Sequence, residues 1–340
     1  MTTMDSAVIR TSAPVRLDFA GAWTDVAPFA AEERGVVVNA AIELRTRVEL
    51  RLNHSRYDLR SDELDERVEA DTLGELARDG RLELLKAAVR SSGTGPCALR
   101  ASAAAPPGSG LGTSGALSVA LVYAFAASRG DRPNALAIAR DAWQLETMDA
   151  GVAGGQQDQY AAALGGFQHL VFDHGTTQAR SLHLEPAFAS ELAAHVVVCH
   201  TGRSRFSGGT IARVMQAYVD RDRVVVGALH ALVDVAEAMA EALLNADLAA
   251  VGKLLNANWI EQRRLDSRMQ TPAMARLEAA LSGAGALGGK AAGAGAGGSM
   301  FFVVPGDTAP ATAAATECGA RLIPVEWAAD GVRRIGDQPV

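Results

Sequence analysis

The order of apolar and polar positions predicts strands in the first third of the chain. Residues 7–20 and 34–52 contain many β-branched side chains and alternate partly between apolar and polar positions, as half-buried strands do. Residues 97–105 (CALRASAAA) predict a further strand, whereas 55–90 are charged and irregular and predict one amphipathic helix near 72–90. We therefore expect an early sheet with little helix.

Helical patterns follow in the middle of the chain. The segment ALSVALVYAFAAS (116–128) is apolar on every side, which predicts a mostly buried helix. A second helix is expected over 133–150, with Pro133 in its first turn. After a glycine-bounded segment at 151–166, the segments HLVFDHG and RSLHLEP predict a short pair of strands.

The composition changes near residues 185–195, and we expect a domain boundary there, with an N-terminal domain over 1–188 and a C-terminal domain over 189–340. The elements expected in the second domain are a strand (HVVVCHTG), helical stretches at 207–245 and 247–282 with a break at Pro272, a strand (MFFVVP), a helix near 308–318 and a strand (RLIPVEW). This mixed order favours an α+β fold over a doubly wound sheet. The apolar stripe within 207–245 predicts either a buried helix face or a homodimer surface.

Composition restricts the class of protein. The 340 residues are 49% hydrophobic and 21% charged, as in a globular protein with a substantial core. A net charge of −7 argues against a protein that coats nucleic acid, which needs clustered positive charge. Three distant cysteines predict neither a disulfide framework nor a zinc site. The first residues lack a signal-peptide layout and no apolar run reaches the ~18–20 residues of a membrane span, so we expect a cytoplasmic protein without a membrane partner.

Two glycine-rich runs are candidate binding loops. The first, GSGLGTSG at 108–115, lies between a predicted strand and a predicted helix. Glycines let the backbone approach an anion, and a helix N-terminus offers unpaired N–H groups. This run therefore predicts a phosphate cradle, with the Thr113 and Ser114 hydroxyls near the position of a magnesium ion. The alternative is a tight strand–helix turn that Ser114 caps.

The second run, GALGGKAAGAGAGGSM at 285–300, precedes a strand. Because glycines are unfavourable inside a helix, it predicts either close backbone packing or a loop that folds over a ligand. Neither run fits G-x-x-x-x-G-K-[ST], which excludes a Walker-A loop at the level of sequence. A dinucleotide fold is disfavoured, because neither run lies in the strand–helix–strand order that it requires.

Charged residues near the first run match the needs of phosphoryl transfer, which requires a held metal ion, cations around the moving group and a residue that orients the nucleophile. Glu146 and Asp158 are candidate acids, since antiparallel packing of the two helices would bring both to the glycine loop. Arg16 and Asp25 lie on and just after the first predicted strand. For any one of these residues, a solvated surface charge is the alternative.

Three motifs in order resemble the GHMP kinases, the superfamily of galactokinase, homoserine kinase and mevalonate kinase. They are APVRLDFAGAWTD (13–25), PPGSGLGTSGA (106–116) and GALGGKAAGAGAGGSMFFVV (285–304). The segments GGQQDQYAAALGG (154–166) and HTGRSRFS (200–207) look like the sugar-1-kinase branch that contains D-glycero-D-manno-heptose 7-phosphate kinases, with fucokinases as near relatives. The resemblance covers nearly the whole chain and implies a two-domain α+β fold with ATP and sugar between the domains, the second domain being ferredoxin-like.

The resemblance also implies roles for single residues. The residues implied to bind ATP are Gly108, Ser109, Gly110, Leu111, Gly112, Thr113, Ser114 and Gly115. Ser114 and Glu146 match the positions that hold Mg²⁺. Asp158 matches the acid that takes or orients the proton of the sugar hydroxyl, and Arg16 matches a cation that stabilises both Asp158 and the transferred phosphoryl group.

The resemblance implies substrate contacts as well. Asp25 matches a ligand of the sugar hydroxyls, Gly155 lies in the motif of the catalytic acid, and Trp23 either lines the sugar pocket or packs in the core. Arg205 and Lys290 match positions that would meet a phosphate already on the sugar, with Arg203 as an extra cation beside them.

The function expected from the resemblance is ATP-dependent phosphorylation of the anomeric (C1) hydroxyl of a heptose 7-phosphate. The alternatives are a kinase of an unphosphorylated sugar, such as fucose or a hexose, and a sugar and ATP sensor without turnover. The sequence departs from the family pattern at four loop positions, Ala22, Thr113, Gly115 and Ala296. An alanine at positive φ costs on the order of 1 kcal/mol, so either these alanines have negative φ or the loops differ slightly.

Overall fold

The computed structural model describes residues 8–202 and 208–336. Its strands are β1 Val8–Ala20, β2 Gly35–Arg51, β3 Tyr57–Ser61, β4 Glu66–Ala70, β5 Ala98–Ala103, β6 Phe167–Asp173, β7 Thr176–Leu182, β8 Val196–His200, β9 Gly288–Ala291, β10 Ser299–Val303, β11 Arg321–Ile323 and β12 Arg333–Arg334. Its α-helices are α1 Phe29–Glu32, α2 Glu83–Ser92, α3 Thr113–Ser128, α4 Ala135–Gln144, α5 Gln157–Leu164, α6 Pro186–His195, α7 Gly208–Val219, α8 Arg223–Leu244, α9 Leu248–Leu265, α10 Pro272–Gly283 and α11 Ala309–Glu317.

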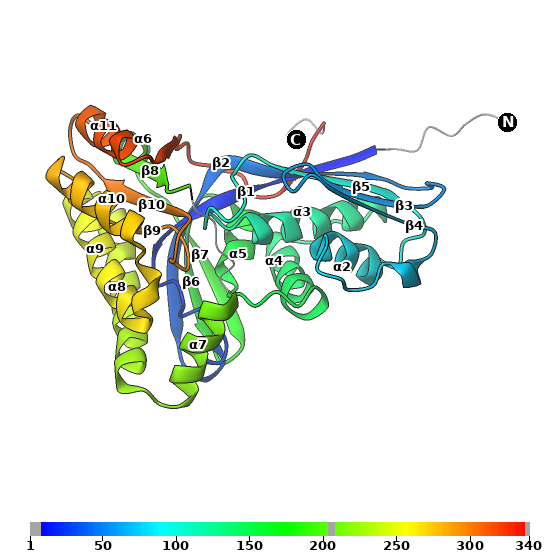
Figure 1. Ribbon diagram of the computed structural model, residues 1–340, viewed down its shortest axis with the longest axis horizontal. Helices are drawn as coiled ribbons and strands as arrows, with labels where there is room; N and C mark the ends of the chain where they lie inside the picture. The colour runs from blue at the N-terminus through cyan, green and yellow to red at the C-terminus, as the bar shows by residue number, and fades with distance from the viewer. Residues whose placement is uncertain (1–7, 203–207, 337–340) are drawn as a thin grey trace.

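The larger sheet has the strand order β12-β1-β2-β5-β3-β4, and β6 and β7 extend it from β2. Its centre is the long antiparallel pair of β1 and β2. Figure 1 shows α3 and α5 on one side of this pair and α8 and α9 on the other, and all four helices contact β1. Both faces of β1 are therefore covered, which explains why nearly every residue after Arg10 is buried.

The smaller sheet has the order β11-β8-β10-β9 and is antiparallel throughout. Helices α8 and α9 pack against each other beside it (Figure 1). The apolar stripe of α8, which includes Leu229, Leu232 and Met239, is fully buried in the core of this chain. The buried-face interpretation of 207–245 is thus confirmed, and the stripe itself is not free to form a homodimer surface.

Most elements lie where the sequence predicts them, and two differences have clear causes. The hairpin of β3 and β4 was not predicted, because polar residues fill most of both strands, as in the cross-strand pair of Arg60 and Arg67. The helix expected near 72–90 is shorter and comprises only α2. The break expected at Pro272 is present: α9 ends at Leu265, and Pro272 is the first residue of α10, where Thr271 Oγ1 accepts a hydrogen bond from the backbone N–H of Met274.

The helix expected over 133–150 changes its winding near its end. Asn134 caps α4 by accepting a hydrogen bond from Ala137 N, and α4 continues into a π-helical turn over Leu145–Asp149. Such turns shift the direction in which side chains point, and they are frequent at functional sites. Glu146 lies in this turn.

The end of the described chain returns to the larger sheet. Trp327 forms an isolated bridge with Ile42, and its indole N–H donates to Ala189 O at 2.8 Å. β12 then pairs with β1, with Thr11 opposite Arg334. Because part of the second half completes the first sheet, the division of the chain at residue 188 stays a prediction.

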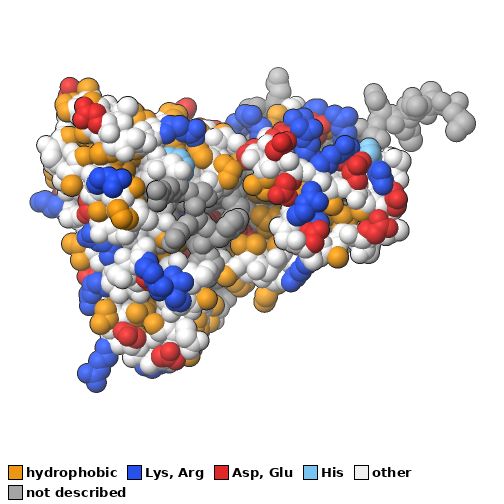
Figure 2. Space-filling model, viewed as in Figure 1, with side chains coloured by type: hydrophobic (Ala, Val, Ile, Leu, Met, Phe, Trp, Pro, Cys, Tyr) orange, Lys and Arg blue, Asp and Glu red, His pale blue; other side chains and the backbone are white. Residues whose placement is uncertain are grey.

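Positive and negative side chains intermingle on the surface formed by β3, β4 and α2, at the right of the view in Figure 2. The ion pairs there include Arg67 with Asp58 at 2.7 Å and Arg56 with Asp71 at 2.9 Å. Among the described helices, none is both long and apolar enough to cross a lipid bilayer.

Candidate active site

The first glycine run forms an open turn between β5 and α3. Gly108, Gly110 and Gly112 have φ angles of +66°, +77° and +77°, a left-handed conformation that glycine adopts without strain. Gly112 is the N-cap of α3, and no side chain caps this helix end. Ser114 is therefore not the helix cap considered above. The N–H groups of the first turn of α3 remain available to an anion.

Two hydroxyl groups of this loop are candidate hydrogen-bond donors to a ligand. Ser109 Oγ and Thr113 Oγ1 are buried and have no hydrogen-bond partner within the described part of the chain. Leaving such a group unpaired costs about 1–3 kcal/mol. Since hydroxyls and N–H groups can all donate, the loop has the hydrogen-bonding character that phosphate oxygens require.

Arg16 connects this loop to the other predicted site residues. Its guanidinium Nη1 donates to Gly110 O at 2.6 Å and to Ala292 O at 2.9 Å, and its backbone N–H donates to Leu111 O at 2.9 Å. Its Nε and Nη2 contact Asp158 Oδ1 at 2.8 and 2.7 Å. The Arg16 side chain is 6% exposed, so a cation stands beside the glycine loop in a largely dry environment.

Asp158 lies in the first turn of α5 and faces the same loop. A Cβ atom added to Gly112 would come within 3.1 Å of Asp158 Cγ, and one added to Gly115 would come within 2.5 Å of Asp158 Cβ. The two glycines therefore let the carboxylate approach the loop. The Asp158 side chain is 25% exposed, so one side of it remains open to a substrate hydroxyl.

Glu146 is 4% exposed and lies beside the N-terminus of α3. Gln159 Nε2 donates to Glu146 Oε2 at 2.6 Å, Ser118 Oγ donates to the same oxygen at 3.4 Å, and Ser114 also hydrogen-bonds the carboxyl group. Burial, together with the nearby charge of Asp158, raises the pKa of Glu146 to about 7. Among the described residues, no Lys or Arg is paired with this carboxyl group, whose partners are Gln159, Ser118 and Ser114. Oxygen ligands from a carboxylate and a hydroxyl suit Mg²⁺, so Glu146 and Ser114 fit such an ion.

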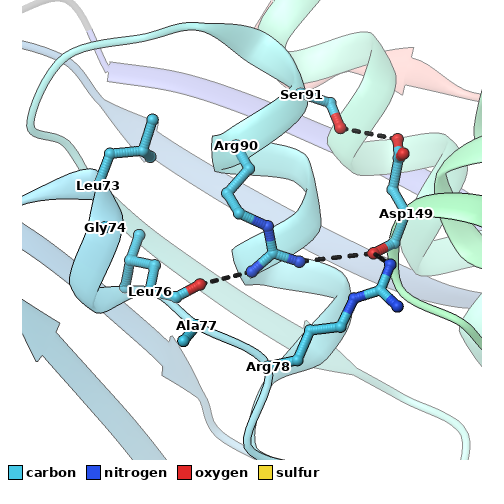
Figure 3. Close-up of a pocket in the computed structure, with 8 residues that line it drawn as sticks. All are labelled: Leu73, Gly74, Leu76, Ala77, Arg78, Arg90, Ser91 and Asp149. Atoms are coloured by element: carbon cyan, nitrogen blue, oxygen red, sulfur yellow. Dashed lines mark hydrogen bonds between the residues drawn. The ribbon is translucent and has the colours of Figure 1, made fainter.

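Two arginines fix the π-helical turn that carries Glu146. Arg78 Nη2 donates to Met148 O and Asp149 O, Arg90 Nη2 donates to Asp149 O at 3.5 Å, and Ser91 Oγ donates to Asp149 Oδ2 at 2.7 Å. Figure 3 shows these side chains around a cavity of about 460 Å³ between the loop at 73–78 and the turn. The contacts tie the turn to α2 and to the loop before it.

Asp25 is buried and contacts the start of α5, the helix that carries Asp158. Its Oδ2 accepts hydrogen bonds from the backbone N–H groups of Gln156 and Gln157 at 2.8 and 3.0 Å, which caps the start of α5. A Cβ atom on Gly155 would lie 2.0 Å from the same oxygen, so only glycine permits this approach. Burial raises the pKa of Asp25 to about 6. The structure thus gives Asp25 and Gly155 a common role in placing Asp158, and the predicted sugar contacts remain predictions.

Trp23 packs in the second hydrophobic core with a φ of +85°, which is strained for a bulky residue. It is 3% exposed, and its indole N–H has no hydrogen-bond partner in the described part of the chain. The packing interpretation is therefore confirmed for the ring, while the N–H group remains free to donate to a ligand.

The second glycine run packs directly on the first. A Cβ atom on Gly293 would lie 2.6 Å from Gly110 O, and Ser299 N donates to Ser109 O at 2.7 Å. The glycines of the second run thus permit close packing of its backbone against that of the first run. Ala296 has a φ of +63° and donates its N–H to Met269 O at 2.6 Å, so this alanine does adopt the strained conformation.

Lys290 is not placed as the sequence predicts. Its side chain is 0% exposed, and its ammonium donates to Asp18 O at 2.7 Å and pairs with Asp18 Oδ2. The prediction that it meets a sugar phosphate is wrong for this structure, because a fully buried and paired ammonium cannot reach a substrate. Arg203 and Arg205 lie outside the described residues.

Sequence reasoning missed two amides on α9. Asn258 and Gln262 are fully buried one turn apart. Asn258 Oδ1 accepts from Gly21 N at 2.9 Å, and Gln262 Nε2 donates to Gly293 O at 2.8 Å. The pair thus joins the first motif to the third. The only available signal was two polar residues four apart on the apolar face of a helix, which is weak.

Comparisons with known proteins agree with this geometry. The GHMP kinases N terminal domain matches residues 81–166, and the GHMP kinases C terminal domain matches 239–318. The chain is 31% identical to the D-glycero-α-D-manno-heptose 7-phosphate kinase of Campylobacter jejuni, over 87% of this chain and 89% of that protein.

Two solved structures share the fold. A D-glycero-D-manno-heptose 1-phosphate kinase from Bacteroides thetaiotaomicron has a TM-score of 0.79 at 24% identity, with 97% of this chain and 100% of that chain covered. Galactokinase from Lactococcus lactis, complexed with galactose, has a TM-score of 0.74 at 20% identity, with 96% and 95% covered. The α+β prediction is confirmed as the two-domain fold of these enzymes, whose family takes its phosphoryl group from ATP. The chain belongs to the GHMP kinases, and it is a phosphotransferase with an alcohol group as acceptor.

Proposed function

We propose that this chain is a sugar-1-kinase, which transfers the γ-phosphoryl group of ATP to the anomeric (C1) hydroxyl of a heptose 7-phosphate and yields a 1,7-bisphosphate. The observation that carries the chemistry is the Arg16–Asp158 pair beside the glycine loop. The heptose assignment is supported by the similarity to a heptose 7-phosphate kinase along most of both chains. In this proposal ATP is the phosphoryl donor, and the enzyme acts in the cytoplasm.

In this proposal, residues 108–115 and the first turn of α3 bind the β- and γ-phosphates. The orphaned hydroxyls of Ser109 and Thr113 would then gain acceptors. Ser114 and Glu146 would hold Mg²⁺, which supplies positive charge to the phosphates when bound. The buried Glu146 carboxylate supports this assignment, because a cation would compensate its charge.

Asp158 accepts a hydrogen bond from the C1 hydroxyl and takes its proton as the new O–P bond forms and the bond from the γ-phosphorus to ADP breaks. The anomeric hydroxyl is the most acidic hydroxyl of a sugar, so a carboxylate suffices as base. Arg16 holds the Asp158 carboxylate in place through Nε and Nη2 and stabilises the charge that develops on the transferred group. The 25% exposure of Asp158 is consistent with access to a hydroxyl from one side.

The test is ADP release with Mg-ATP on a panel of heptose 7-phosphates, sedoheptulose 7-phosphate, fucose, galactose and mannose. We expect turnover on a heptose 7-phosphate, loss of that turnover in Asp158→Asn, and a product phosphorylated at C1 by ³¹P NMR. Turnover on a free sugar alone would overturn the heptose assignment and keep the kinase. ATP binding without turnover on any acceptor would favour a sensor.

A kinase of an unphosphorylated sugar is the second candidate, and the burial of Lys290 favours it. Of the three basic residues expected to meet a sugar phosphate, Lys290 is paired inside the protein with Asp18. The phosphate would therefore depend on Arg203 and Arg205. Replacing both by alanine should raise the KM for a heptose 7-phosphate at least tenfold, whereas an unchanged KM would support the second candidate.

A further inference from the structure

Two cross-links join β1 to the third motif, and they share one register. Arg16 Nη1 donates to Ala292 O at 2.9 Å, and two residues further along β1, Asp18 O accepts from Lys290 Nζ at 2.7 Å. Arg16 and Asp18 lie two residues apart on β1, and their partners Ala292 and Lys290 lie two residues apart in the opposite chain direction. The two segments are not neighbours in a sheet, so these two side-chain contacts, together with the Asn258 and Gln262 amides, connect the first motif to the third.

The Asp18–Lys290 pair is unusual in its burial. Both side chains are 0% exposed, and the ammonium lies 5.7 Å from the centroid of the Phe301 ring. Asp18 Oδ1 has no hydrogen-bond partner in the described part of the chain. A buried ion pair offsets its desolvation only when its remaining polar atoms are also satisfied. This pair is therefore poorly explained by a contribution to stability.

Geometry gives the pair another role. A guanidinium is a rigid planar fork, so when Nη1 is held by Gly110 O and Ala292 O, the directions of Nε and Nη2 follow. Those two nitrogens are the ones that contact Asp158. The Ala292 carbonyl lies two residues from Lys290. Its position therefore sets the direction in which Nε and Nη2 of Arg16 point toward Asp158.

We propose that Lys290 and Asp18 are positioning residues, which fix the third motif against β1 so that Arg16 is aimed at Asp158. They act through Arg16 and touch no reacting atom. This proposal rests on the proposed function, in which Arg16 and Asp158 perform the transfer. It also gives Lys290 a use that does not require a phosphate on the substrate.

The decisive variant is the double replacement Asp18→Asn with Lys290→Met, which removes both charges and keeps similar volumes. Either single replacement leaves an unpaired buried charge or dipole and is expected to destabilise the fold. The double variant should unfold at a temperature close to that of the parent. Its kcat should fall at least tenfold, while the KM values for ATP and sugar change less than threefold. A kcat within threefold of the parent would overturn the proposal.

Lys86→Met is the matched control. Lys86 is 1% exposed and bonds Ala77 O and Asp79, and within the described residues none of its hydrogen bonds or ion pairs reaches the three motifs. The control should lose stability and retain kcat. If it loses kcat to the same extent as the double variant, a general effect of removing a buried lysine explains both, and the proposal fails.

A second readout does not depend on turnover. In protein with ¹⁵N-labelled arginine, the Nε–H signal of Arg16 can be identified by its loss in Arg16→Lys. Its hydrogen exchange should be at least tenfold faster in the double variant than in the parent, because Nε–H loses its fixed acceptor. Equal exchange rates would overturn the positioning role. If the parent phosphorylates no sugar, the proposed function fails, and this measurement still decides the role of the pair.

Discussion

Arg16 and Asp158 contact each other at 2.8 and 2.7 Å although 142 residues separate them in the chain. One lies on the first strand and the other on a helix that Asp25 caps. The pair forms because the glycine loop between them has no side chains at Gly112 and Gly115. The charges meet beside the N-terminus of α3, where an anionic ligand would receive both the cation and the free N–H groups.

Asp158→Asn keeps the shape of the side chain and removes its charge. We expect kcat to fall at least 100-fold, in line with the 10²–10⁴-fold typical of general-base removal. ATP affinity, measured by calorimetry, should change little, because Asp158 does not contribute to the phosphate loop. A kcat near that of the parent would show that the carboxylate neither takes nor orients the proton.

The replacement Gly115→Ala, in the first turn of α3, should disturb the position of Asp158. The new Cβ would lie 2.5 Å from Asp158 Cβ, so α5 has to move away from α3. We expect a loss of about 1–3 kcal/mol in the free energy of unfolding and a lower kcat. Gly227→Ala in α8 is the control, since nothing lies within 4 Å of its added Cβ. It should stabilise the protein by about 0.5–1 kcal/mol and leave kcat unchanged. Equal effects of the two replacements would contradict this account.

Glu146→Gln tests the metal site. The amide has nearly the same shape but a weaker affinity for a divalent cation, so the Mg²⁺ concentration for half-maximal rate should rise at least tenfold. Binding of Mn²⁺ in the presence of a non-hydrolysable ATP analogue, followed by electron paramagnetic resonance, should weaken in parallel. Unchanged Mn²⁺ binding would remove Glu146 from the metal site.

Asp25 predicts a pH dependence of stability. Burial raises the pKa of Asp25 from 3.8 to about 6. Asp25 is therefore protonated in the native state and ionised in the unfolded chain over the pH range between these two values. Stability therefore falls as the pH rises through it. Between about pH 4 and pH 7, the free energy of unfolding of the parent should fall by up to about 3 kcal/mol relative to that of Asp25→Asn. Urea titrations at several pH values measure this, and parallel curves for the two proteins would refute it.

The sequence was most informative where a local pattern needs a local conformation. The φ angles of Gly108, Gly110 and Gly112 follow from a glycine run between a strand and a helix. The α8 stripe was correctly predicted as a buried face because its apolar spacing fits one side of a helix. The resemblance to the GHMP kinases assigns roles to Glu146, Asp158 and Arg16, which no local pattern distinguishes from surface charges, and those roles remain predictions.

The sequence could not predict which residues far apart in the chain contact each other. Lys290 within a glycine run has the character of a phosphate ligand, and only the fold reveals Asp18 beside it, 272 residues away. Asn258 was missed for the same reason, since its partner Gly21 is 237 residues distant. The strands β3 and β4 were missed because each has only five residues and three of the five are polar, although Tyr57, Leu59 and Ala70 face the core.

The pairing of β12 with β1 has a consequence for biosynthesis. Thr11 and Ser12 are synthesised long before their strand partners, Arg334 and Arg333. Until β12 has been synthesised, the backbone N–H and C=O groups at this edge of β1 are therefore unpaired and can bind other chains. A truncated chain that ends before Arg333 would keep this edge exposed, and such fragments should be prone to aggregate and depend on chaperones.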